Sequence, residues 1–146
     1  MILFDTNVIL DALEKDSEYF EWAFKLITAA AAESNGVVNA VTVAELCAGD
    51  RDPATVRADL LNWDLQVLDI PSAAAAVCGK AYRRYTISRK TSGGGDAPKI
   101  PLPDFFIGAH AEIMGWKLAT RDSERIARYF PKVHLLTPKK QFATRA

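Results

Sequence analysis

The segment Met1-Ile-Leu-Phe-Asp5-Thr-Asn-Val-Ile-Leu-Asp11 opens the chain and decides the predicted fold. Its apolar residues and the aspartate that follows them, Ile2 to Asp5, indicate a short and fully buried strand. Thr6 follows as a suitable N-cap, and residues 7–14 carry the apolar periodicity of a helix. A buried strand that runs straight into a helix is typical of an α/β protein with a parallel sheet.

The alternation of strands and helices continues along the chain. Further strands are expected at residues 37–41, 65–70, 117–120 and 133–136, and further helices at residues 18–32, 42–48, 53–64, 71–90, 103–114 and 123–129. Residues 91–101, with three consecutive glycines and two prolines beyond them, are predicted to be a flexible loop. This order predicts a three-layer α/β/α sandwich around a mainly parallel sheet of about five strands.

Length and charge limit the class of protein. The 146 residues favour a single domain over 1–146, and 49% hydrophobic with 25% charged residues excludes a disordered chain. The formal net charge of zero hides an asymmetry: residues 1–52 hold ten acids and three bases, whereas residues 53–146 hold eight acids and fifteen bases. We therefore expect a domain with two electrically different sides, the basic one suited to a polyanion.

Several other classes are excluded by what the chain contains. Its two cysteines, Cys47 and Cys78, cannot form a disulfide framework, and they do not combine with His110 and His134 into the usual spacing of zinc ligands. No apolar run approaches the roughly 20 residues that a membrane helix needs, and the first residues lack the basic segment of a signal peptide. We expect a cytoplasmic protein without contact to a membrane.

Three acids occupy positions that a parallel sheet brings together, and a fourth acid follows the predicted loop 91–101. Asp5 ends the first strand, Asp122 follows the strand that ends at Thr120, Glu45 lies one turn into the helix after the second strand, and Asp104 lies in the first turn of a helix. Ligands of such sheets bind at the carboxyl ends of the strands. Each acid alone also has a structural explanation, such as interaction with a helix N-terminus.

Together, the four acids predict a metal site. Two carboxylates about 4 Å apart repel each other by about 4 kcal/mol at an effective dielectric constant of 20, so the cluster needs protons, basic side chains or metal ions. Oxygen ligands without imidazole or thiolate favour Mg²⁺ or Mn²⁺. Two such ions can activate a water and stabilise the leaving oxygen of a phosphodiester. With the basic remainder of the chain, this chemistry indicates hydrolysis of a nucleic acid.

Over its whole length, the sequence resembles the PIN-domain ribonucleases, and more narrowly the VapC toxins of bacterial toxin–antitoxin pairs. The resemblance rests on four motifs in order: Leu3-Phe-Asp5-Thr-Asn-Val-Ile-Leu-Asp11, Val41-Thr-Val-Ala-Glu45-Leu-Cys-Ala-Gly49, Pro103-Asp104-Phe-Phe-Ile-Gly-Ala-His-Ala111 and Ala119-Thr-Arg-Asp122. It implies a metal-dependent endoribonuclease, a homodimer, and a VapB-like antitoxin that blocks the site. It also implies that the metal-binding acids are Asp5, Glu45, Asp104 and Asp122.

Residues near these motifs are candidates for supporting roles. Thr120 could donate a hydrogen bond to a cluster carboxylate, and Asn7 could hold Asp5 in place. Alternatively, Thr120 is simply a β-branched residue at a strand end, and Asn7 simply favours a turn. Asp11 is expected to have no role, because six residues of helix carry it away from Asp5.

The basic residues predict where RNA would bind. The stretch 80–90 holds five bases and no acid, with two tyrosines among them, and we expect Lys80, Arg83 and Arg84 to contact phosphates. Its alternative is a solvated helix face. Arg121 belongs to a second basic group with Arg125 and Arg128 beside Asp122; it is a further candidate for substrate binding, and one member of the group could instead neutralise the acids.

Two other functions are compatible with parts of the pattern. A non-catalytic PIN-like scaffold would bind RNA or protein without cleaving it, but it would have no need of the full set of acids. A receiver-type signalling domain also alternates strands and helices, but Asp5-Thr-Asn7 lacks the expected pair of acids, and Asp69-Ile-Pro71 is a poor phosphoacceptor loop. The RNA that would be cleaved does not follow from the sequence.

Overall fold

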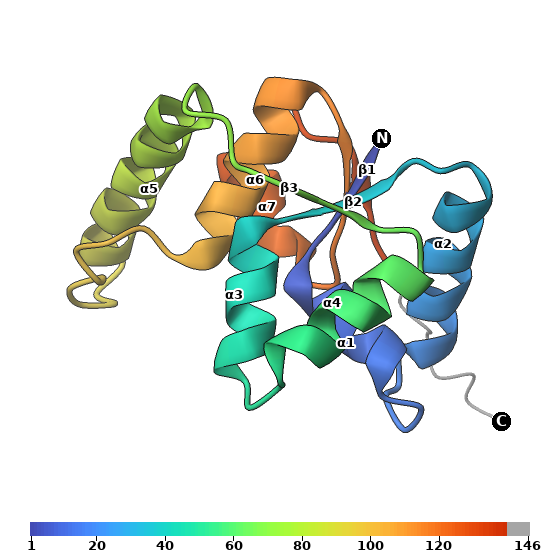
Figure 1. Ribbon diagram of the computed structural model, residues 1–146. Helices are drawn as coiled ribbons and strands as arrows, with labels where there is room; N and C mark the ends of the chain where they lie inside the picture. Colours follow the sequence, from blue (N-terminus) through green and yellow to red (C-terminus); the bar gives the residue numbers. More distant parts are fainter. Residues whose placement is uncertain (140–146) are drawn as a thin grey trace, which may run out of the picture.

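A five-stranded parallel sheet forms the centre of the molecule, which confirms the predicted α/β/α sandwich (Figure 1). The computed structural model describes residues 1–139, so residues 140–146 of the predicted domain 1–146 lie outside the described part. The strands are β1 (Ile2–Phe4), β2 (Gly36–Asn39), β3 (Gln66–Leu68), β4 (Lys117–Ala119) and β5 (Leu135–Leu136). They lie in the order β3-β2-β1-β4-β5, and each neighbouring pair is parallel.

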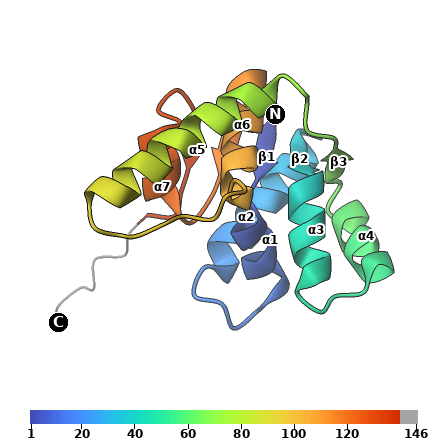
Figure 2. The same ribbon diagram turned by 90° about the vertical axis from the view of Figure 1, so that its left-hand side faces the viewer.

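Helices cover both faces of this sheet. They are α1 (Thr6–Leu13), α2 (Phe20–Ala32), α3 (Ala40–Ala48), α4 (Pro53–Asn62), α5 (Ala74–Thr91), α6 (Pro103–Met114) and α7 (Ser123–Tyr129). On the central strand, Leu3 packs with residues of α5, α6 and α7, and Phe4 packs with residues of α1 to α4. Side chains alternate in this way because successive residues of a strand point to opposite faces. Both Figures 1 and 2 show α5 on the outside of α6 and α7.

The predicted element boundaries differ from the structure mainly at helix starts. Thr6 was expected to cap the first helix, but Asp5 is the N-cap and its side chain accepts a hydrogen bond from the Thr6 N–H. The predicted strand 37–41 ends at Asn39, because the Asn39 side chain accepts from two backbone N–H groups and caps α3. The helix predicted to begin at Pro71 begins at Ala74. The predicted loop 91–101 has no regular secondary structure beyond Thr91, where α5 ends.

The sheet brings three chain segments to one edge. Ile2 of β1 is in register with Gly36 of β2 and with Lys117 of β4, so the carboxyl ends of these three strands are level. The strand order reverses at β1, and such a reversal opens a crevice at the carboxyl ends of an open sheet. The order also differs from the 2-1-3-4-5 order of the receiver-type domain considered above.

Close packing of α6 positions the helix against this edge. A Cβ atom on Gly108 would lie 2.5 Å from the ring of Phe130, so only glycine allows the two segments to approach this closely. Gly115 ends the helix in the left-handed conformation, with φ of 67°. In residues 1–139, none of these helices has the length and apolar character to cross a bilayer.

Candidate active site

A groove of about 330 Å³ lies at the carboxyl ends of the strands. It is formed by residues from the first turns of α1 and α6, from α3, and from the segment around α7. The structure brings all four predicted acids into this one groove. Its lining consists of Asp5, Thr6, Asn7, Leu10, Glu45, Leu102, Pro103, Asp104, Asp122 and Arg125.

Asp5 is the most enclosed of these acids, with 7% of its surface exposed. Its Oδ1 accepts from the Thr6 N–H at 2.7 Å, and its Oδ2 accepts from Thr120 Oγ1 at 2.8 Å and from Asn7 Nδ2 at 3.3 Å. Burial raises the pKa of Asp5 to about 6, although the Thr120 and Thr6 hydrogen bonds oppose this and the charges of Asp104 and Glu45 add to it. Asp5 is thus surrounded by neutral donors.

The two predicted supporting residues, Asn7 and Thr120, therefore both contact Asp5. They reach it from different elements, Asn7 from the first turn of α1 and Thr120 from the end of β4. Thr120 Oγ1 also accepts from the Asp122 N–H at 3.2 Å. One hydroxyl consequently links the first and the last acid of the predicted site.

Glu45 is held by a residue that the sequence did not indicate. The Thr6 hydroxyl donates to Glu45 Oε1 at 2.7 Å and lies 3.1 Å from Thr42 Oγ1. Thr6 directly follows Asp5, so its position next to a candidate acid was the available signal. The start of α3 is fixed in turn by Asn39, whose Nδ2 lies 3.2 Å from His110 Nδ1.

Asp104 lines the groove from the first turn of α6, and Asp122 lines it from the position directly before α7. Arg125 Nη1 donates to Asp104 Oδ2 at 3.1 Å, and the Arg125 guanidinium lies over the Tyr85 ring, 5.2 Å from its centroid. Burial raises the pKa of Asp104, against the effect of the Arg125 charge. Arg125 is thus the member of the second basic group that pairs with one of the acids, Asp104. The two residues lie 21 positions apart on different helices, so no local spacing in the sequence signalled this contact.

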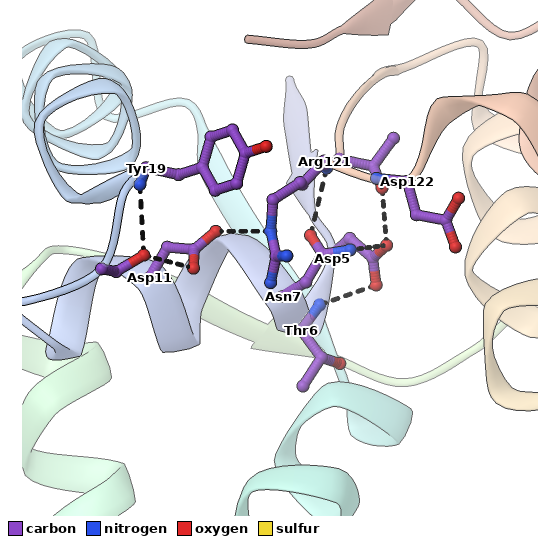
Figure 3. A network of polar contacts seen from close by, with 9 residues as sticks. Asp5, Thr6, Asn7, Asp11, Tyr19, Arg121 and Asp122 are labelled. Atoms are coloured by element: carbon purple, nitrogen blue, oxygen red, sulfur yellow. Dashed lines mark hydrogen bonds and ion pairs between the residues drawn. The ribbon is translucent and has the colours of Figure 1, made fainter.

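Asp122 is exposed, and its carboxylate makes no capping hydrogen bond to α7. Asp122 occupies the N-cap position of α7, but its side chain does not cap the helix. In Figure 3 the side chains of Asp122 and Arg121 leave the backbone on opposite sides. Arg121 is directed to Asp11, and its Nε donates to Asp11 Oδ2 at 2.9 Å.

The three basic residues predicted on α5 lie outside the groove lining. Lys80, Arg83 and Arg84 are all exposed, and Arg84 Nη2 donates to the carbonyl of Tyr129 at 2.9 Å. This hydrogen bond ties α5 to the end of α7. The basic surface is consequently adjacent to the helix that carries Arg125, not to the acids themselves.

The acidic side chains of the groove are the kind of ligand that a hard divalent cation requires. All four acids offer carboxylate oxygens, and neither cysteine nor histidine lines the groove. Asp5 is desolvated without a cationic hydrogen-bond partner, which leaves its negative charge to be compensated by a ligand. In residues 1–139, no three acidic, histidine or cysteine side chains converge closely enough to enclose an ion, so the acids are spread around the groove.

Comparisons with known proteins agree with this fold. The model of the PIN domain family matches residues 2–130. The chain is similar to FitAcB from Neisseria gonorrhoeae (26% identity, TM-score 0.64, 93% of this chain and 96% of that chain). It is also similar to DNA-bound VapBC from Salmonella typhimurium (24%, 0.63, 93% and 96%) and to VapBC2 from Rickettsia felis bound to a promoter DNA fragment (18%, 0.62, 94% and 98%).

No curated protein matches the chain in sequence. The family match nevertheless covers most of the chain, including all four acids of the groove. The chain belongs to the PIN domain family.

Proposed function

We propose that the chain is a VapC-like toxin, an endoribonuclease that requires Mg²⁺ or Mn²⁺ and is inhibited by a VapB-like antitoxin. The observation that carries the proposal is Asp5, a buried carboxylate with a pKa of about 6, in a groove with three further acids. Neutral hydrogen bonds hold its oxygens in place without neutralising the charge. Such a group favours a cation as its ligand.

The acids have different roles in this proposal. Asp5, Asp104 and Asp122 hold the principal cation, and Glu45 completes the site or reaches toward a second cation. The bound metal supplies Lewis-acid polarisation of the phosphodiester and lowers the pKa of a water nucleophile. Asn7 and Thr120 orient Asp5, and Thr6 orients Glu45.

The RNA would reach the groove from the basic side of the molecule. Lys80, Arg83 and Arg84 are exposed on α5, and we assign them, with Arg121, to contacts with phosphates. Replacing both Arg83 and Arg84 with alanine should weaken RNA binding and flatten its salt dependence, because each neutralised phosphate contributes about −0.7 to the logarithmic slope. If the double variant shows the same salt dependence of RNA binding as the wild-type protein, Arg83 and Arg84 do not contact phosphates and this part of α5 is simply a solvated helix face.

A partner protein is expected for the same groove. The similar solved structures include VapBC complexes, which supports a VapB-like antitoxin for this chain. Uncompensated carboxylates attract an arginine or lysine, so we expect the antitoxin to place a basic side chain among the four acids and to compete with the metal. We further propose that the protein is a cytoplasmic homodimer.

Cleavage of an end-labelled RNA by the purified protein tests the enzymatic proposal. Activity should disappear in excess EDTA and return when Mg²⁺ or Mn²⁺ is restored. Asp104→Asn should be inactive, whereas Asp64→Asn should retain activity, because Asp64 lies between α4 and β3 and contacts Ser34. Cleavage that persists in EDTA would contradict the metal mechanism. A wild-type protein that binds RNA without cleaving it would favour the non-catalytic scaffold.

Growth of cells tests the toxin proposal. The wild-type chain expressed alone should arrest growth, and Asp5→Asn should be tolerated. Sequencing the RNA ends that appear on induction would identify the cleaved RNA. A wild-type chain that is harmless without a partner, yet fully active on RNA in vitro, would contradict the toxin proposal.

A further inference from the structure

A partly buried ion pair connects the end of α1 to the loop after β4, with Asp11 buried and Arg121 40% exposed. The side chain of Asp11 is 8% exposed, and its Oδ2 accepts from Arg121 Nε at 2.9 Å, although 110 residues separate the two. Figure 3 shows Arg121 lying between Asp11 and the segment that contains Asp5. Removing Arg121 would leave the buried Asp11 carboxylate without its charged partner, so Asp11 depends on Arg121.

The loop between α1 and α2 holds this pair from a second direction. Ser17 Oγ donates to Asp11 Oδ1 at 2.8 Å and accepts from the Tyr19 N–H at 3.2 Å. The Arg121 guanidinium also lies 5.0 Å from the centroid of the Tyr19 ring. Asp11 therefore uses both carboxylate oxygens, and Arg121 is restrained by a charge and by an aromatic face.

The backbone of Arg121 carries this restraint into the groove. Its N–H donates to Asn7 Oδ1 at 3.2 Å, and Asn7 Nδ2 donates to Asp5 Oδ2 at 3.3 Å. The residues on either side of Arg121 belong to the same network: Thr120 Oγ1 donates to Asp5 and accepts from the Asp122 N–H. By holding this loop in place, Arg121 thus fixes the side-chain amide of Asn7, which contacts Asp5, and the backbone position of Asp122.

We propose that Asp11 and Arg121 are positioning residues for the metal site, an inference that rests on the proposed function. Their ion pair anchors residues 120–122, and through Asn7 and Thr120 it sets the orientation of Asp5. Asp11 touches none of the predicted metal-binding acids itself. Removal of a partner that orients a metal ligand typically weakens metal binding by about 10–100-fold.

This role can be tested without RNA cleavage by measuring the affinity of the metal-free full chain for Mn²⁺ in a calorimetric titration. Asp11→Asn keeps the volume and an oxygen for Ser17 but removes the charge. Arg121→Lys keeps the charge for RNA phosphates but loses the Nε donor. Each should weaken Mn²⁺ binding by about 10–100-fold. The double variant should be no weaker than the singles, because both changes remove one interaction.

Asp64→Asn is the matched control, since Asp64 also accepts a serine hydroxyl, from Ser34 at 3.1 Å, but lies at the turn before β3. It should bind Mn²⁺ like the wild-type protein. Exchange of the Arg121 and Asp122 amide protons in the metal-free protein supplies a second readout. Exchange should be faster in Asp11→Asn than in Asp64→Asn.

Three outcomes would overturn the inference. If both variants bind Mn²⁺ as the wild-type protein does while Asp104→Asn does not bind, the pair has no positioning role and the proposed function stands. A lower melting temperature with unchanged Mn²⁺ affinity assigns the pair to stability alone. If the wild-type chain binds no Mn²⁺, the metal part of the proposed function fails. Unchanged amide exchange in Asp11→Asn then overturns the anchoring as well, whereas faster exchange supports it.

Discussion

Asp5 and Asp104 lie in the same groove but are held in opposite ways. Asp5 ends the central strand and is 7% exposed, with hydrogen bonds from a backbone N–H, a hydroxyl and an amide. Asp104 lies in the first turn of α6, after a long loop, and its carboxylate is paired with the Arg125 guanidinium. The pKa of each acid is raised by burial, yet only Asp104 has a cation beside it.

This comparison shows that a carboxylate can be held in a fixed orientation without having its charge compensated. Neutral donors fix the oxygens of Asp5 and leave its charge, so a ligand cation gains an oriented but uncompensated carboxylate. Asp104 already has Arg125 as a cationic partner at Oδ2, so a ligand cation has to compete with Arg125 for this carboxylate. Asp5 thus offers an uncompensated carboxylate to a cation, whereas Asp104 offers one that Arg125 partly compensates.

The largest expected effect is common to both acids. Asp5→Asn and Asp104→Asn should each lower the rate of RNA cleavage by about a thousand-fold, because Lewis-acid stabilisation is worth several kcal/mol and each 1.4 kcal/mol is a factor of ten. Single-turnover cleavage with saturating Mg²⁺ measures this. If one variant keeps most of its activity, the two acids do not share a metal.

The next effect concerns the free energy of unfolding, which should change in Asp5→Asn but hardly in Asp104→Asn. The pKa of Asp5 is about 6 in the folded protein and about 3.8 otherwise, so the native state binds more protons between these values and stability falls as pH rises through this range. A difference of about two pH units corresponds to roughly 3 kcal/mol. Asp5→Asn should therefore raise the free energy of unfolding of the metal-free protein by about that amount at neutral pH, with little effect below pH 4.

Asp104→Asn is the comparison for this measurement. It removes a partly exposed ion pair, worth about 0.2–1 kcal/mol, so the free energy of unfolding should change little. Urea unfolding at a series of pH values, without metal, gives both results. A loss of stability in Asp5→Asn at neutral pH would mean that its hydrogen bonds outweigh the cost of the buried charge.

The smallest effect concerns Arg125. Arg125→Met should let Mn²⁺ bind up to about five-fold more tightly, because the ion pair that competes for Asp104 is worth at most about 1 kcal/mol at this exposure. Arg57→Met, at an exposed arginine of α4, is the matched control and should leave the Mn²⁺ affinity unchanged. Weaker Mn²⁺ binding in Arg125→Met would show that Arg125 orients Asp104 instead of competing with the metal.

Local sequence patterns were sufficient to predict most of the helices and strands and the general place of the site. The patterns placed α6 at 103–114 and α7 at 123–129, where the structure has them, because capping residues, prolines and glycines act over a few residues. They also indicated that three of the four acids, Asp5, Glu45 and Asp122, would share one groove, because the carboxyl ends of parallel strands meet at one edge of a sheet.

Several of the residues that hold those acids could not be predicted in this way, because they come from distant parts of the chain. The contact of Thr6 with Glu45 spans 39 residues, that of Arg125 with Asp104 spans 21, and that of Arg121 with Asp11 spans 110. The sequence argument gave Asp11 no role because it followed one helix away from Asp5. The strand order places β4 beside β1, and this brings the loop after β4 against the end of α1. Local periodicity reports which face of an element is apolar, whereas a pair between two elements depends on which strands are neighbours.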